Sequence, residues 1–265
     1  MNIFEKMLGQ YLDVCTYQKN LSAKTVKAYR IDLLQFIEYS SINSNLFDRE
    51  SVNQYIAYLN QNYKPRSVKR KIASLKAFCT WLDEEGYLLE NPFHKLRIKL
   101  NEPLVLPKTI PLRVIEQLLS AAYQAHKKSR TNQELKISLR DIAVIELLFA
   151  TGMRVSELCG LNTEDIDLID GTVKIYGKGP KERVLQITNN TVIASLRNYI
   201  NEYRPRAQSP FFLTQRQTRL AEQSVRLALR KYAEQIGISQ RITPHMFRHS
   251  FATLLLEKDV DIRYI

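Results

Sequence analysis

Apolar side chains recur at helical spacing through the first part of the chain. One stripe follows a serine that can cap a helix: Ser22, then Val26, Tyr29, Leu33, Phe36 and Ile37. A second follows a proline, which costs little at the first position of a helix: Pro65, then Val68, Ile72, Leu75, Phe78 and Leu82. Gly86 and Asn91-Pro92 then interrupt the pattern. We therefore expect a helical first domain over residues 1–96.

The pattern changes twice beyond that domain. Residues 97–111 contain three prolines and no helical period, which predicts an extended linker. Residues 112–265 then form the second domain, with helices expected over 114–123, 141–150, 154–159, 221–235 and 244–258. Within it, apolar residues alternate on both sides of the basic, glycine-containing loop 177–182, which predicts a β-hairpin. The expected fold is mainly α, with a small β-hairpin in the second domain.

Composition narrows the class of protein. The 265 residues are 45% hydrophobic and 25% charged, as in a globular protein with a proper core. No apolar run is long enough to span a membrane, and the start lacks the apolar stretch of a signal peptide. Three distant cysteines, Cys15, Cys79 and Cys159, fit reduced thiols in a cytoplasmic protein. Lys and Arg number 39 against 27 Asp and Glu, and this net charge of +12 points to a polyanionic partner.

The basic residues gather in two segments. Residues 51–82 contain no acid and six Lys or Arg, and residues 204–231 contain seven basic residues and one acid, Glu222. Either segment alone can be a solvated face of a helix. Two such segments in separate halves of the chain favour a protein that contacts phosphates from two sides.

Two short motifs in the second half can carry chemistry. Arg154 and Glu157 are three residues apart, which suits either a structural ion pair or a guanidinium that a carboxylate orients toward a phosphate. We expect Arg154 to be half-buried. Lys178 lies between two glycines, which suits either a solvated turn or a mobile ammonium that delivers a proton.

A third motif places His245, Arg248 and His249 on one face of a helix, near its start. The helix N-terminus favours negative charge, so this face is either a polar first turn or an anion site. A zinc site is not favoured, because the adjacent Glu of a metalloprotease helix is missing and no cysteine cluster is near. We expect no bound metal.

In this order and spacing, the three motifs resemble the catalytic domain of the tyrosine recombinases, most of all the phage-integrase and Xer-like bacterial branch. The segments 21–36 and 67–92 resemble the family's N-terminal core-binding domain, and Pro107–Pro111 resembles its linker. The resemblance implies a two-domain, C-shaped clamp around duplex DNA. It also implies site-specific recombination through a 3′-phosphotyrosyl intermediate, which needs neither a metal nor ATP.

The resemblance assigns roles by motif. Arg154 and Arg248 hold the non-bridging oxygens of the scissile phosphate, Lys178 is the general acid, His245 assists proton transfer, and Glu157 supports them. The DNA-contacting residues expected on two helices and the hairpin are Lys24, Thr25, Lys27, Lys64, Arg66, Lys69, Arg70, Lys71, Lys181 and Arg183. The implied partners are double-stranded DNA with an inverted-repeat site and further copies of the chain, as a dimer to tetramer, in the cytoplasm at the nucleoid.

The pattern departs from the family at its end. Members continue into a histidine or tryptophan box and then the nucleophilic tyrosine, whereas this sequence stops at Ile265. Tyr264 lies too close to His249 to replace that tyrosine. We therefore expect a truncated recombinase that binds DNA without cleaving it, so that a nicked suicide substrate traps no covalent complex. Two alternatives stay open: a type IB topoisomerase, against which the helical first domain argues, and a non-catalytic DNA-binding module.

Overall fold

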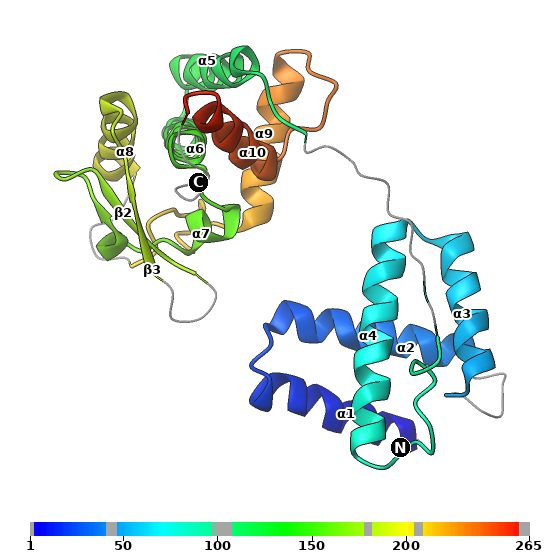
Figure 1. Ribbon diagram of the computed structural model, residues 1–265. Helices are drawn as coiled ribbons and strands as arrows, with labels where there is room; N and C mark the ends of the chain where they lie inside the picture. Colours follow the sequence, from blue (N-terminus) through cyan, green and yellow to red (C-terminus); the bar gives the residue numbers. More distant parts are fainter. Residues whose placement is uncertain are drawn as a thin grey trace. The chain divides into compact units, whose positions relative to one another are not determined.

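The computed structural model describes residues 3–40, 47–96, 98, 108–177, 182–203 and 209–259. The chain divides into two compact units, Met1–Val105 and Leu106–Ile265. In Figure 1 the helices of the first unit run from blue to cyan, and the second unit runs from green to red. Each unit has its own hydrophobic core.

The first unit is helical, as predicted. Its elements are α1 (Ile3–Asp13), a π-helical turn η1 (Val14–Gln18), α2 (Ala23–Ser40), α3 (Arg49–Asn62) and α4 (Pro65–Glu84). The Ser22 Oγ accepts a hydrogen bond from the backbone N–H of Thr25 at 3.2 Å, which confirms the predicted cap of α2. A second cap holds α3, where Asp48 accepts from the N–H of Ser51.

Helix α4 is the centre of this unit and packs against both α2 and α3. Its predicted apolar stripe is buried at all five positions, Val68, Ile72, Leu75, Phe78 and Leu82. Aromatic rings fill the space around the stripe: Phe78 lies 5.0 Å from Tyr11 and 5.9 Å from Trp81, between ring centroids. This packing leaves Arg66, Lys69, Arg70 and Lys76 of α4 exposed.

The second unit surrounds one buried helix. Its helices are α5 (Leu112–Lys128), α6 (Asn132–Thr151), α7 (Val155–Gly160), α8 (Asn190–Tyr203), α9 (Glu222–Gln235) and α10 (Pro244–Leu256), with a 3₁₀ turn η2 (Thr163–Asp165). Helix α6 packs against the other five helices, and residues 141–148 are buried all round. The burial of α6 is confirmed, but α6 begins nine residues earlier than predicted. A capping box explains its start, because Thr131 and Glu134 satisfy each other's backbone N–H groups.

The predicted hairpin is present and extends into a small sheet. Strands β1 (Ile166–Asp167), β2 (Thr172–Tyr176) and β3 (Glu182–Gln186) are antiparallel and neighbours in that order. Val173 and Ile175 are buried, whereas Lys174 and Tyr176 between and beyond them are exposed. The loop residues Lys178 and Lys181 lie outside the described residues. Strand β1 and helix α8 were not predicted.

The last part of the predicted linker packs in the second unit. The buried Ser250 of α10 accepts a hydrogen bond from the N–H of Ile110 at 2.6 Å and lies 3.0 Å from its carbonyl oxygen. Ile110 itself is buried in the core of this unit. These contacts fix the start of the second unit against α10, which carries His245 and Arg248.

Two further observations concern the cysteines and the possibility of a membrane-spanning helix. Cys15, Cys79 and Cys159 are buried, and none forms a disulfide, as predicted. Among the described residues, no helix combines the length and the apolar character that crossing a membrane requires.

Candidate functional site

Helix α10 lies close to the junction of α6 and α7. Gly152 ends α6 with φ of 57°, in the left-handed region. A Cβ atom at this position would lie 2.3 Å from the ring of Phe251 on α10. Only a glycine therefore satisfies both the turn and the packing of α10 against it.

Glu157 organises the first turn of α7. Its carboxylate accepts the backbone N–H of Arg154 at 2.7 Å and the Arg154 guanidinium at 2.9 Å, and Arg183 of β3 donates to it at 2.8 Å. Burial alone would raise the pKa of Glu157, but these hydrogen bonds and charges lower the pKa below its ordinary value. The pairing at i+3 is confirmed. Arg154 is more exposed than expected, with 58% of its side chain accessible.

Arg248 reaches the same junction from α10. Its guanidinium donates to the carbonyl oxygen of Gly152 at 2.8 Å. Burial and then the positive charge of Arg154 lower the pKa of Arg248 below its ordinary value. We call Arg154, Arg183, Arg248 and Glu157 the arginine cluster. Three cations and one carboxylate leave it two positive charges in excess, which suits a phosphate.

The arginine cluster borders two adjoining hollows. The larger, of about 920 Å³, lies between α7 and the hairpin and is lined by Arg154, Glu157 and Arg183. The smaller, of about 160 Å³, is lined by Gly152, Arg183 and Arg248. Arg183 lines both hollows, so each of the three guanidinium groups borders at least one of them.

The two histidines of α10 lie together, as the predicted helical face requires. The rings of His245 and His249 are 4.4 Å apart between centroids. His245 is exposed and His249 is half-buried. Burial, followed by the charges of His245 and Arg248, lowers the pKa of His249, so this ring is mainly neutral at pH 7.

Sequence reasoning missed the residue that holds the other end of α7. The Arg219 guanidinium donates to the carbonyl oxygens of Cys159, Gly160 and Leu161, at 3.2, 2.8 and 3.1 Å. A cation at a helix C-terminus satisfies carbonyls that have no partner within the helix. The contact crosses almost sixty residues of sequence, so no local pattern indicates it.

This finding changes the interpretation of the basic segment 204–231. In addition to Arg219, Arg226 pairs with Glu222 and Arg230 pairs with Glu234. Three of its arginines therefore serve contacts within the chain. The segment is not simply a second face for phosphates.

The basic residues of α2 and α4 divide into an exposed and a buried group. Lys24, Lys27, Lys64, Arg66 and Lys69 are exposed, and Thr25 is half-buried. Arg70 is also exposed, although its guanidinium pairs with Asp32 of α2. Lys71 is the exception to the prediction of DNA contact.

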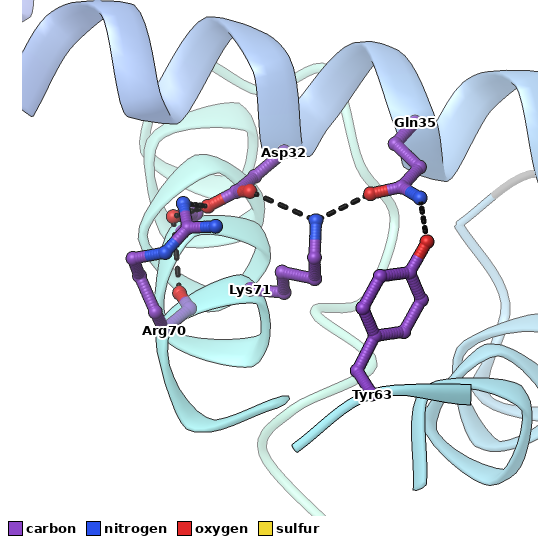
Figure 2. Close-up of polar contacts among 6 residues, drawn as sticks. Asp32, Gln35, Tyr63, Arg70 and Lys71 are labelled. Carbon is purple, nitrogen blue, oxygen red and sulfur yellow. Dashed lines mark hydrogen bonds and ion pairs between the residues drawn. The ribbon is translucent and has the colours of Figure 1, made fainter. Parts of the chain in front are cut away.

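The side chain of Lys71 is only 6% accessible and points between α2 and α4. Figure 2 shows its ammonium bonded to Asp32 and Gln35, with Gln35 in turn bonded to the hydroxyl of Tyr63. A buried ammonium with these partners does not face a DNA phosphate. The expectation for Lys71 is therefore corrected to a structural position.

No metal centre emerges from the described part of the chain, where no group of three or more His, Cys, Asp or Glu side chains is placed to hold an ion. The site that does emerge is a cluster of guanidinium groups beside two histidines. The excess positive charge of this cluster suits an anionic ligand.

Comparison with known proteins identifies the family. Residues 108–265 match the model of the Phage integrase family, and residues 8–86 match that of the Phage integrase N-terminal SAM-like domain. A tyrosine recombinase of Agathobacter rectalis is 48% identical, over 100% of this chain and 88% of its own length. Tyrosine recombinase XerD of Listeria monocytogenes is 34% identical, over 98% of this chain and 88% of its own length.

Solved structures share the fold. XerH recombinase bound to its difH substrate has a TM-score of 0.73 at 22% identity, covering 97% of this chain and 75% of that one. Lambda integrase bound to DNA has a TM-score of 0.71 at 17% identity, and the match covers 98% of this chain and 88% of that one. The chain belongs to the phage integrase family of tyrosine recombinases, enzymes of site-specific DNA recombination.

Proposed function

We propose that the arginine cluster binds the scissile phosphate of duplex DNA. Arg154 and Arg248 take the non-bridging oxygens, because their guanidinium groups converge on the α6–α7 junction with an excess of positive charge. Glu157 holds Arg154 in place from beneath, and Arg183 contacts the adjoining DNA. The convergence of three guanidinium groups on Glu157 and Gly152 is the observation that carries this proposal.

The proton transfers fall to residues beside the cluster. Lys178 is the general acid toward the leaving 5′-oxygen, a role that rests on its glycine-flanked position between β2 and β3. His245 assists proton transfer at the nucleophile, since its exposed ring is on the same helix as Arg248 and one turn before it. Phosphoryl transfer of this kind depends on positioning and charge neutralisation, which these side chains supply.

The first unit, with its SAM-like match, is the proposed core-binding domain over residues 1–96. We propose residues 97–111 as the linker and residues 112–265 as the catalytic domain. The proposed DNA contacts are Lys24, Thr25, Lys27, Lys64, Arg66, Lys69, Arg70, Lys181 and Arg183. The exposure of Lys24, Lys27 and Lys69 supports this face.

The proposed partners follow from the relatives. XerH is bound to its difH substrate, in one structure a palindromic one, and lambda integrase has been solved as a dimer on a core site. We infer an inverted-repeat duplex and a dimer to tetramer on DNA for this chain as well. The proposed location is the cytoplasm, at the nucleoid.

A neutral phosphate tests the arginine cluster. After footprinting has located the site, the phosphate at the cleavage position is replaced by an uncharged methylphosphonate. This should weaken binding by the wild-type chain about tenfold, because charge-assisted hydrogen bonds are lost. The same replacement should cost little in the Arg154→Ala/Arg248→Ala variant. Equal losses of affinity in both proteins would mean that Arg154 and Arg248 do not bind this phosphate.

The salt dependence of binding tests the first unit. Charge reversal at Lys69 should weaken binding and reduce the slope of log K against log salt by about one, if Lys69 meets a phosphate. Lys95, an exposed lysine that pairs with Glu90 outside α2 and α4 in the sequence, is the matched control. An unchanged slope for Lys69→Glu would mean that this face of α4 is only solvated.

A further inference from the structure

A buried carboxylate lies directly beneath an exposed arginine of the first unit. The Asp32 side chain is 1% accessible, whereas that of Arg70 is 47% accessible. Asp32 accepts hydrogen bonds from Arg70, from Lys71 at 3.1 Å and from the Ser74 hydroxyl at 2.9 Å. Figure 2 shows Arg70 and Lys71 approaching the carboxylate from α4, while Asp32 extends from α2.

The charges in this group do not cancel. One carboxylate faces two cations, so the group of Asp32, Arg70 and Lys71 carries one positive charge in excess. The Lys71 ammonium is buried and is held additionally by Gln35 and by the ring of Tyr63, 5.0 Å from its centroid. Of the two cations, only Arg70 has a surface that a ligand can reach.

This arrangement solves a specific problem of phosphate binding. An arginine that is free in solvent must be ordered when it binds, which costs rotamer entropy. An arginine paired with a single carboxylate is ordered but neutralised, so it attracts a phosphate weakly. A second, buried cation removes this difficulty, because it neutralises the carboxylate while the arginine stays anchored.

We propose that Asp32 is a positioning residue that presents the Arg70 guanidinium to a DNA phosphate, with Lys71 as the buried counter-cation that offsets the Asp32 charge, so that the positive charge of Arg70 is not cancelled. This inference rests on the proposed function, since it assumes that the basic face of α4 contacts DNA. It adds that two residues hidden from DNA set the strength of one phosphate contact. Lys71 thus acts on DNA binding without touching the DNA.

The test uses a variant that leaves the net charge at its wild-type value. Asp32→Asn/Lys71→Met removes one negative and one positive charge and frees Arg70 from its anchor. Binding to a short mixed-sequence duplex is measured by fluorescence anisotropy over a range of salt concentrations. A lost phosphate contact should weaken binding about eightfold at 0.1 M salt and reduce the salt slope by about one. We expect a loss approaching this limit.

Two further variants make the result specific. Arg70→Gln should reproduce the loss, and adding Asp32→Asn/Lys71→Met to Arg70→Gln should change neither the affinity nor the slope further. Glu90→Gln/Lys95→Met removes an exposed carboxylate–lysine pair of the same unit and should leave both quantities unchanged. Fluorescence of Trp81, the only tryptophan of the chain, verifies that each variant is folded. If the Met variant unfolds, Asp32→Asn/Lys71→Gln replaces it.

The outcomes separate this inference from the proposed function. Wild-type binding by Asp32→Asn/Lys71→Met overturns the inference, as does an equal further loss in the Arg70→Gln background, which would mark a structural effect. If Lys69→Glu reduces the slope but Arg70→Gln does not, the DNA-binding face stands and the inference fails. If neither variant changes the slope, both fail.

Discussion

Asp32 in the first unit and Glu157 in the second are two versions of one device. Each is a nearly inaccessible carboxylate that holds two basic side chains from beneath. At Glu157 both partners, Arg154 and Arg183, reach solvent. At Asp32 one partner reaches solvent and the other, Lys71, is buried.

The difference separates stability from function. Removing Glu157 leaves two arginines that water can solvate. The main consequence should therefore be a loss of their fixed orientation, with a smaller loss of stability. Removing Asp32 strands a buried ammonium, whose desolvation is no longer compensated. Asp32 therefore belongs to the core of the first unit, whereas Glu157 lies at the edge of a hollow in the second unit.

The largest predicted effect tests this contrast directly. Asp32→Ala should lower the free energy of unfolding of the first unit by about 3–5 kcal/mol, because it leaves Lys71 unpaired. Glu157→Ala should cost about 1–2 kcal/mol, from a lost helix cap and two solvated ion pairs. Urea unfolding followed by Trp81 fluorescence reports the first unit, and hydrogen exchange of α7 reports the second. Equal losses would break the comparison.

The arginine cluster also depends on Gly152, where the expected loss of about 2–5 kcal/mol overlaps that of Asp32→Ala. Gly152→Ala combines a left-handed backbone, at about 1–2 kcal/mol, with a clash against Phe251, at about 1–3 kcal/mol. Gly237→Ala is the matched control, because φ is 73° there and no atom lies within 4 Å of the added Cβ. Thermal unfolding should show a greater loss for Gly152→Ala. Equal losses would mean that α10 yields to the new methyl group.

A pH series sharpens the description of Glu157. Its folded-state pKa is lowered, so its contribution to stability is complete above the unfolded-state pKa of about 4.3 and is lost as the pH falls through the folded value. The difference in unfolding free energy between wild type and Glu157→Gln should therefore shrink as the pH falls below about 4.3. A difference that is constant from neutral to acid pH would contradict the lowered pKa.

The smallest effect concerns His249. Its pKa should lie below the ordinary value of about 6.5, because of burial first and the charges of His245 and Arg248 next. Arg248→Gln removes one of these charges and should raise the His249 pKa part of the way back. NMR titration of the ring protons measures both values. A pKa that does not respond to Arg248→Gln would place the two side chains farther apart than the structure does.

Much of this molecule follows from local patterns. The stripe of α4, the cap at Ser22 and the alternation of the hairpin are short-range consequences of side-chain periodicity, and each is confirmed. The start of α6 carried its own signal, the capping box of Thr131 and Glu134, although the apolar run alone placed it too late. Strand β1, with only two residues, is too short to leave a pattern.

The motifs around Arg154, Lys178 and His245 also identify the family, because residue types at fixed spacing can be recognised in the sequence without knowledge of the fold. By contrast, the positive charge of a segment did not show which of its residues are available to DNA. Lys71 and Arg219 stand in basic segments like any DNA-binding residue, yet one is buried against Asp32 and the other caps α7. The sequence by itself determined most of the helices, the hairpin and the family. Only the tertiary structure decided which cations face outward, because their partners lie tens of residues away and are set by packing.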